Sequence, residues 1–298
     1  MGTGNILPLE IGVCSWSLGT SSWSSLKSML HGLDLRVVQL NLSEAVGLEP
    51  AAQEQWVRSA RDSSLLFSAG MISFSGEDYS SLATIKATGG FVPEASFETR
   101  LQRVAAAGRI ARQIGIDIVA THAGFLPSAA EPEPFARMVR RLQRVADILA
   151  ESSITLLFET GQEKPQDLAA FLTALGRGNV GINLDPANLI LYGAGEPAAA
   201  AQMLGPWIRH IHAKDARRDA TASGEQWRGR EGVLGEGDAQ LEQVLAVLWK
   251  QGYRGPAVVE WEGGADAMAA LRRGQGAHVG ATGELENNRR KSGRNIGS

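Results

Sequence analysis

Cysteine is nearly absent from this sequence of 298 residues, which contains only Cys14. One cysteine cannot form an internal disulfide, so a disulfide-stabilised fold is excluded, and the composition fits a reducing compartment. We therefore expect a cytoplasmic protein. Cys14 lies within an apolar, strand-like run, where a small buried thiol is more common than a reactive nucleophile.

Long apolar runs are missing as well. No run approaches the roughly 18 apolar residues typical of a membrane-spanning helix. The first ten residues, MGTGNILPLE, lack the basic region and apolar core of a signal peptide. We predict neither a membrane-spanning segment nor a signal peptide.

The chain has no strong excess of charge of either sign. It has 29 Lys and Arg residues against 32 Asp and Glu residues, which gives a net charge of -3. This balance offers no electrostatic basis for binding nucleic acid or an anionic membrane. We expect a small-molecule substrate, and the sequence is also compatible with a homo-oligomer.

The sequence does contain a regular alternation of strand-like and helix-like segments. Eight short runs rich in Val and Ile are separated by helical patterns: IGVCSW, RVVQLNL, SLLFSAGM, IDIVATHAG, ITLLFETG, NVGINLDP, WIRHIHAKD and PAVVEWEG. Such runs are typical of parallel strands buried on both faces. Eight units in about 270 residues predict a (β/α)8 TIM barrel. A doubly wound sheet is the alternative, but the first turn, CSWSLGTSS, lacks its G-x-G-x-x-G signature.

The predicted domain organisation is simple. We expect residues 1–274 to form one barrel domain, because no composition shift divides them. Residues 275–298 are polar and rich in Gly, which predicts a disordered tail. The loop over residues 72–96 is far longer than the usual connection, and we expect it to cover the mouth of the barrel.

Four successive apolar runs end in residues that can bind metals: Glu159, Asp185, His212 and Glu260. The carboxyl ends of neighbouring strands meet on one face of a parallel barrel, so these side chains can converge. Three carboxylates without a cation would repel one another. Three oxygen ligands and one imidazole suit Mn²⁺, Mg²⁺, Co²⁺ or Zn²⁺, so the pattern favours one divalent metal ion.

Each of these residues also has a purely structural interpretation. Asp185 could cap the helix that follows it. The strand period of two places His210 and His212 on the same side, so the pattern does not choose between them. Glu159 and Glu260 could each form a salt bridge with a neighbouring Lys or Arg, for which Lys214 and Arg230 are available.

Other polar and aromatic residues are candidates for substrate contact. His122 ends the fourth run, in ATHAG, and we predict that it contacts substrate. Trp16 and Phe74 could stack on the face of a sugar, although packing in the core is an equal alternative for both.

Five segments, FETG, NLDPANL, HIHAKD, LGEGD and VVEWEG, resemble the xylose-isomerase-like barrel superfamily, and more narrowly its sugar phosphate isomerase/epimerase group. The resemblance covers about residues 10–273. It implies one divalent metal held by Glu159, Asp185, His212 and Glu260, and it selects the second histidine of HIHAKD. It also implies that the two glutamates act as acid and base, and that Glu236 in LGEGD contacts substrate.

The sequence departs from the group at one informative position. Asn188 stands where many of the epimerases carry a histidine, so contacts to the sugar should differ. We assign Asn188 and Lys214 to substrate binding. The superfamily also includes apurinic endonucleases, which use additional histidines to bind three metals; the five histidines of this chain do not fit that activity.

The ligand set predicts the chemistry. A divalent cation can chelate a carbonyl and its adjacent hydroxyl and stabilise an enediolate, while Glu159 and Glu260 remove and return a proton. Return to the same carbon is epimerisation, and return to the neighbouring carbon is aldose–ketose isomerisation. The alternatives are a lyase that dehydrates a cyclic polyol ketone and a non-catalytic sugar-binding barrel.

Overall fold

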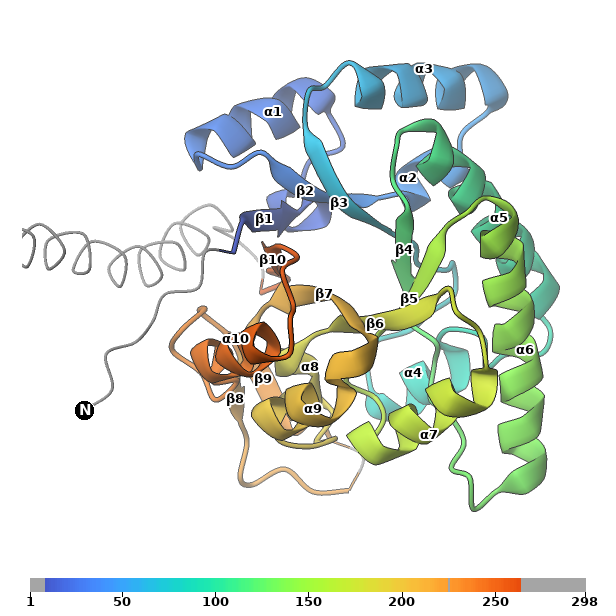
Figure 1. The fold of residues 1–298 in the computed structure, drawn as a ribbon, viewed down its shortest axis with the longest axis vertical. Coiled ribbons are helices and arrows are strands. Elements are labelled where there is room, and N and C mark those ends of the chain that lie inside the picture. Colours follow the sequence, from blue (N-terminus) through green and yellow to red (C-terminus); the bar gives the residue numbers. More distant parts are fainter. Residues whose placement is uncertain (1–8, 225, 264–298) are drawn as a thin grey trace, which may run out of the picture.

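A closed barrel of eight parallel strands forms the centre of the molecule (Figure 1). The computed structural model describes residues 9–224 and 226–263. The order around the barrel is β1-β10-β7-β6-β5-β4-β3-β2. The barrel strands are β1 (Ile11–Cys14), β2 (Val37–Asn41), β3 (Leu66–Met71), β4 (Ile118–Thr121), β5 (Thr155–Glu159), β6 (Val180–Leu184), β7 (Ile208–Ala213) and β10 (Ala257–Val259). The predicted (β/α)8 TIM barrel is therefore confirmed.

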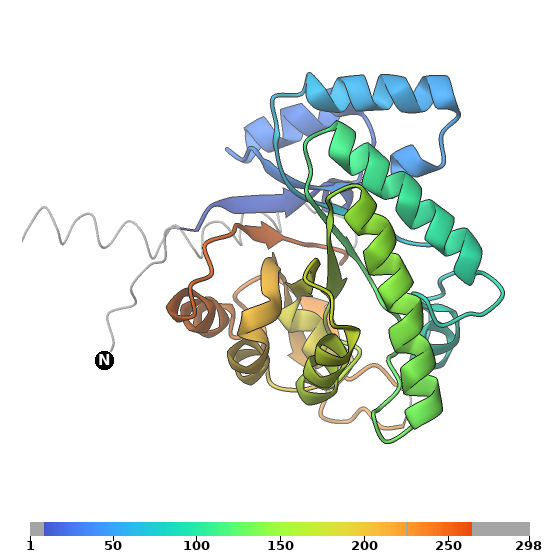
Figure 2. The ribbon, with the colours of Figure 1, turned by 45° about the vertical axis from the view of Figure 1, so that its right-hand side comes forward.

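Helices follow the strands and cover the outside of the barrel (Figure 2). They are α1 (Trp23–Gly32), α2 (Ser43–Val46), α3 (Pro50–Arg61), α4 (Leu82–Thr88), α5 (Phe97–Gln113), α6 (Pro132–Glu151), α7 (Pro165–Leu175), α8 (Pro186–Leu191), α9 (Pro197–Leu204) and α10 (Leu241–Lys250). Five of them begin with proline, whose fixed φ and missing N–H suit the first helical position: α3, α6, α7, α8 and α9. No helix within the described ranges is long and apolar enough to cross a membrane.

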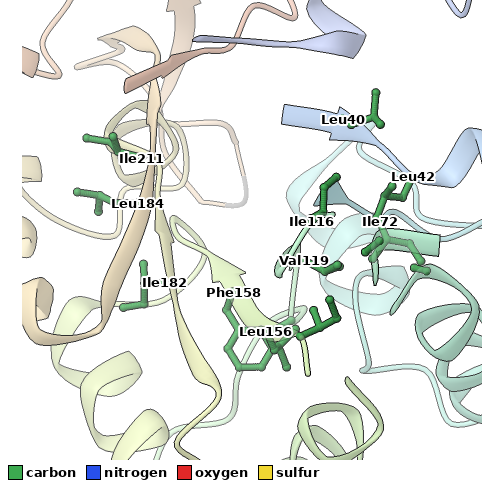
Figure 3. Close-up of a cluster of buried hydrophobic side chains, with 14 of the residues drawn as sticks. Leu40, Leu42, Ile72, Ile116, Val119, Leu156, Phe158, Ile182, Leu184 and Ile211 are labelled. Carbon is green, nitrogen blue, oxygen red and sulfur yellow. The ribbon is translucent and has the colours of Figure 1, made fainter. Parts of the chain in front are cut away.

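The two sides of each strand face different surroundings. Leu156 and Phe158 of β5 belong to the main hydrophobic core, as do Ile182 and Leu184 of β6 (Figure 3). These positions are two residues apart, so they share one face of their strands. The hydrophobic core thus lies mainly between the strands and the helices.

The opposite face of the strands points into the barrel, where several buried side chains are polar. Gln39, Asn183, His210 and His212 are each at most 1 % exposed. Hydrogen bonds join them to one another, for example His210 Nδ1 to Asn183 Oδ1 at 2.9 Å. A buried polar group is tolerated only when it is paired, so this network indicates a specific role for the barrel interior.

Two loops contain structure that the apolar pattern did not predict. Residues 216–237 include most of an antiparallel hairpin of β8 (Asp215–Arg218) and β9 (Gly229–Gly232). The loop over residues 72–96 contains α4. Both elements are short and partly exposed, so they leave little hydrophobic periodicity in the sequence. The predicted tail over residues 275–298 lies outside the described residues.

Candidate metal centre

The four predicted ligands come together at the carboxyl end of the barrel. Glu159 is the last residue of β5, Asp185 follows β6, His212 lies near the end of β7, and Glu260 follows β10. These strands are neighbours around the barrel. One ligand atom from each of the four buried residues lies within 4.8 Å of the others.

The three carboxylates surround a single nitrogen, His212 Nδ1. Glu159 Oε1 lies 3.2 Å from it, Glu260 Oε2 lies 3.3 Å from it, and Asp185 Oδ2 lies 3.7 Å from it. Two ligand atoms that are each about 2.1 Å from one ion are separated by about 3.0–3.4 Å. The spacing therefore suits a shared divalent ion.

Asp185 fits both roles that the sequence allowed, as a helix cap and as a candidate metal ligand. Its Oδ1 accepts hydrogen bonds from the backbone N–H groups of Ala187 and Asn188, at 2.8 and 3.0 Å, and so caps α8. Its Oδ2 turns toward His212 and has no hydrogen-bond donor among the described residues. One carboxylate thus starts a helix and also offers an oxygen to the site.

Burial and neighbouring charges set the protonation of these groups. Burial opposes ionisation of Glu260, but Lys214 and His212 outweigh it and hold the pKa of Glu260 well below its usual range. Burial raises the pKa of Asp185 to about 6 despite the opposing effect of Lys214. Burial opposes the charged form of His212, yet Glu260 and neighbouring groups raise its pKa well above the ordinary value. The carboxylate cluster thus favours a cation at its centre.

The residues present fit a divalent metal. Three carboxylates and one imidazole are the donors that Mn²⁺, Mg²⁺, Co²⁺ and Zn²⁺ accept in proteins. Two buried carboxylate oxygens, Glu159 Oε2 and Asp185 Oδ2, lack a hydrogen-bond donor within the described part of the chain. Buried oxygens in that state are costly unless a cation compensates them.

Besides His212, two side chains contact the carboxylate of Glu159. Asn188 Nδ2 donates to Glu159 Oε1 at 3.1 Å, and His122 Nε2 lies 3.3 Å from Glu159 Oε2. Gly161 permits this arrangement, because a Cβ at that position would lie 2.3 Å from the Cβ of Asn188. The structure therefore places Asn188 and His122 beside the ligand set.

The neighbours of Glu260 are more strongly polar. Trp16 Nε1 donates to Glu260 Oε1 at 2.8 Å, and Lys214 Nζ donates to Glu260 Oε2 at 2.9 Å. Lys214 Nζ also donates to Glu262 Oε2 at 2.6 Å. Both oxygens of Glu260 are therefore bonded, and Lys214 bridges the ligand set to the rim of the site.

A cavity of about 510 Å³ is lined by two of the four ligands, Glu159 and Glu260. Six residues that the sequence singled out line it: Trp16, His122, Glu159, Asn188, Lys214 and Glu260. Sequence reasoning missed most of the remaining lining residues: Asn41, Met71, Ser73, Tyr79, Leu191, Tyr192, Trp227, Gly229, Glu231 and Glu262. Arg230, considered only as an ion-pair partner, lines the cavity too. Most of these residues come from loops or from the hairpin, where no periodic signal marks them.

Glu236 lies elsewhere. It is exposed and does not belong to the cavity lining. The LGEGD segment is organised instead by Asp215, whose Oδ2 accepts from the backbone N–H groups of Gly235 and Gly237 at 3.0 and 2.9 Å. Glu231, three residues before the LGEGD segment, does line the cavity. The structure gives the predicted substrate contact of Glu236 no geometric support.

The loop over residues 72–96 lies at the mouth and is firmly attached. Ser73 and Tyr79 from this loop line the cavity. Glu77 accepts from the backbone N–H groups of Phe74 and Gly90, at 2.9 and 2.8 Å. Phe74 is buried and packs against Phe91, so of the two alternatives for Phe74 the structure selects core packing.

Comparisons with known proteins agree with this architecture. Residues 27–277 match the family described as Xylose isomerase-like TIM barrel. A xylose isomerase domain protein from Planctomyces limnophilus is 26% identical, with 95% of this chain and 99% of that chain covered and a TM-score of 0.80. Among curated proteins no relative was found.

Two further solved structures share the fold at lower identity. The probable 3-DHS dehydratase AsbF from Bacillus anthracis is 18% identical, with 89% of this chain and 97% of that chain covered and a TM-score of 0.69. A D-allulose 3-epimerase from Methylomonas sp. is 17% identical, with 92% of this chain and 98% of that chain covered and a TM-score of 0.62. With the family match over most of its length, the chain belongs to the xylose isomerase-like TIM barrel family.

Proposed function

We propose that the chain is a metal-dependent isomerase of unphosphorylated sugars, either a ketose epimerase or an aldose–ketose isomerase. The observation that carries the proposal is the convergence of two glutamates, Glu159 and Glu260, on His212 Nδ1 beneath a cavity. A reaction that removes and returns a carbon-bound proton needs two such carriers next to a group that stabilises negative charge.

Four residues would bind the metal, and two of them would also transfer protons. Glu159, Asp185, His212 and Glu260 would hold a divalent metal, which would polarise the substrate carbonyl and stabilise the negative charge that develops when the adjacent C–H bond breaks. Glu159 and Glu260 each present a carboxylate to the cavity. One takes the proton from carbon, and the other delivers a proton to the same or the neighbouring carbon.

The neighbouring side chains keep the two glutamates in position. Trp16 Nε1 and Lys214 Nζ donate to the two oxygens of Glu260, so its carboxylate is fixed from both sides. Beside Glu159, Asn188 Nδ2 donates to Oε1 and His122 Nε2 lies 3.3 Å from Oε2, and both side chains line the cavity. Fixed donors at the reacting centre reduce the reorganisation needed during proton transfer.

The charges around the cavity favour a substrate without a phosphate group. Four carboxylates line it: Glu159, Glu231, Glu260 and Glu262. The cations among its described lining residues are Lys214, which already donates to two of those carboxylates, and the exposed Arg230. A phosphate would meet like charge at short range.

Aromatic side chains favour a carbohydrate of compact size. Trp16, Tyr79, Tyr192 and Trp227 line the cavity, and the rings of Tyr192 and Trp227 lie edge to face with centroids 4.9 Å apart. Aromatic faces bind the apolar C–H faces of sugars, while the polar ends of these rings can reach hydroxyl groups. The substrate class proposed here is therefore a free ketose or aldose.

A dehydratase of a cyclic polyol ketone is the second candidate, and Lys214 is the observation that favours it. In that reaction a carboxylate removes a proton from the carbon beside the carbonyl, and the hydroxyl on the next carbon leaves as water after protonation. Lys214 Nζ faces the cavity within hydrogen-bond distance of Glu260. It supplies a third ionisable group, which isomerisation does not require.

Incubation with Mn²⁺ and a panel of ketoses in D₂O tests these possibilities together. An epimerase or isomerase incorporates deuterium into recovered sugar at the reacting carbon. A dehydratase yields a product lighter by one water. A sugar-binding barrel without catalysis yields neither, and that result would overturn the proposed function.

A further inference from the structure

The two ring nitrogens of His212 have chemically different surroundings. Nδ1 faces the carboxylates of Glu159, Glu260 and Asp185. Nε2 faces Gln39 Oε1, at 2.6 Å. The ring thus joins the candidate metal centre to the polar interior of the barrel.

A neutral imidazole can present a lone pair at only one nitrogen. For Nδ1 to bind a cation, the proton must reside on Nε2, and a buried N–H there requires an acceptor. Gln39 Oε1 is within hydrogen-bond distance and is fully buried. The same acceptor also suits a doubly protonated ring, so it need not move when a metal replaces the proton on Nδ1.

The other neighbours of His212 Nε2 do not determine which ring nitrogen carries the proton. Cys14 Sγ lies 3.7 Å away, and a thiol is a weak acceptor. Asn183 Nδ2 lies 3.0 Å from Nε2 and 3.4 Å from Nδ1, so it contacts both nitrogens of His212. The carbonyl oxygen of the Asn183 side chain is occupied by His210 Nδ1 at 2.9 Å.

The backbone and the amide of Gln39 both point to a dedicated role. The pairing of β2 with β3 shifts register between Val38 and Gln39, an irregularity of the kind that redirects a side chain. Gln39 Nε2 has no hydrogen-bond partner within the described residues. Leaving the buried N–H groups of the Gln39 amide unpaired is costly. Turning the amide over would place its NH₂ group against His212 Nε2, and that nitrogen would then have to accept a hydrogen bond instead of donating one.

We propose that Gln39 is a positioning residue that accepts the Nε2 proton of His212 and thereby keeps the Nδ1 lone pair directed at the three carboxylates. This inference rests on the proposed metal-dependent function. Gln39 is a neutral side chain on β2, whereas His212 is a candidate ligand on β7. The proposal is that Gln39 nevertheless sets the metal affinity of His212.

Titration of the purified protein with Mn²⁺ by calorimetry tests the inference without reference to activity. Gln39→Met keeps the approximate size but removes the acceptor, and we expect its affinity to fall about 10- to 100-fold. Gln39→Glu restores an acceptor and should recover affinity to within about threefold of wild type. Ser68→Ala is the matched control, because Ser68 bonds to His210 Nε2 and not to His212.

Equal affinity of wild type and Gln39→Met would overturn the inference. So would an equal loss in Gln39→Met and Gln39→Glu, because that result would mean a packing role. A wild-type protein that binds none of Mn²⁺, Mg²⁺, Co²⁺ and Zn²⁺ would overturn the proposed function along with it.

A measurement on the wild-type protein avoids any folding defect of the variants. In ¹⁵N-labelled protein loaded with Zn²⁺, the His212 ring should carry its proton on Nε2, and that proton should exchange slowly with solvent. A proton on Nδ1, or an Nε2 proton that exchanges as fast as that of the exposed His31, would contradict the role of Gln39.

Discussion

The Glu159 side and the Glu260 side of the site differ in how firmly each carboxylate is held. Glu260 has hydrogen bonds to both oxygens and a direct ammonium partner, Lys214. Glu159 has an amide donor on one oxygen, while the other oxygen faces His122 without a hydrogen bond. The same residue type at the same end of a parallel strand thus has two environments.

The two glutamates therefore differ in how strongly the charge of each carboxylate is stabilised. Lys214 gives Glu260 an ammonium partner, which favours the ionised carboxylate, whereas Glu159 has no ammonium partner among the described residues. Glu260 is therefore the better fixed of the two, and Glu159 has the more adaptable surroundings.

The largest expected effect follows from removing either glutamate. Glu260→Gln and Glu159→Gln should each lower the rate of deuterium exchange at least about 1000-fold, because each loses a proton carrier and a charged ligand together. Metal content of the purified variants, measured by atomic emission, should fall as well.

Glu262→Gln is the matched control for Glu260→Gln. It removes a second carboxylate bonded to Lys214 but lies outside the ligand set. We expect its metal content to equal that of wild type. Full metal occupancy together with undiminished exchange in Glu260→Gln would refute the assignment of Glu260.

Removing the neighbour of each glutamate sharpens the comparison. Lys214→Met should lower kcat/KM about 100-fold, because it leaves the buried Glu260 without its charged donor. Asn188→Ala should cost only about tenfold, the worth of one hydrogen bond to a charged group, and should change the order of preference among sugars while metal content stays intact. A larger loss in Asn188→Ala than in Lys214→Met would reverse the proposed contrast.

The rim of the cavity offers a test of substrate charge. A free ketose should react with a kcat/KM at least about tenfold higher than its phosphate ester, because like charge at short range opposes the ester. Glu231→Gln and Glu262→Gln should narrow that gap, since both side chains line the cavity. Competition between fructose and fructose 6-phosphate in one reaction measures the ratio directly, and a preference for the ester would contradict the assigned class.

A smaller effect is expected at Glu163, a buried carboxyl that, unlike Glu260, forms no ion pair with any residue that the structure describes. Burial raises its pKa from the ordinary value of 4.5 to about 8. Between those values the folded state keeps a proton that the unfolded state has released. The free energy of unfolding should therefore decrease as pH rises, by up to about 1.4 kcal/mol per pH unit, until the folded pKa is passed.

Glu163→Gln should remove that contribution. Its amide oxygen can still accept from the backbone N–H of Leu126, which lies 3.2 Å from Glu163 Oε1. Urea denaturation at pH 5 and pH 8 should show a smaller decrease in the free energy of unfolding for the variant than for wild type. Equal decreases would mean that the Glu163 carboxyl ionises normally in the folded protein.

The sequence predicted those parts of the molecule that repeat. Parallel strands buried on both faces leave apolar runs, and the ligand-type residues stand out because each interrupts such a run at the same end. The barrel and the convergence of Glu159, Asp185, His212 and Glu260 followed from that regularity.

Individual contacts could not be predicted, because they depend on how side chains from distant segments meet. Asn188 reaches Glu159 only because Gly161 leaves room for it. Gln39 sits in an apolar run on β2, and nothing in its local sequence indicates that its amide reaches His212. Glu236 and Glu231 both lie in polar, Gly-rich sequence, so pattern alone could not determine which of them faces the cavity.

Anomalous scattering from crystals grown with Mn²⁺ tests the central claim most directly. The account predicts one strong peak about 2.0–2.3 Å from side-chain oxygens of Glu159, Asp185 and Glu260 and from His212 Nδ1. No peak there at saturating Mn²⁺, or a peak bound through His212 Nε2 with the carboxylates turned away, would contradict it.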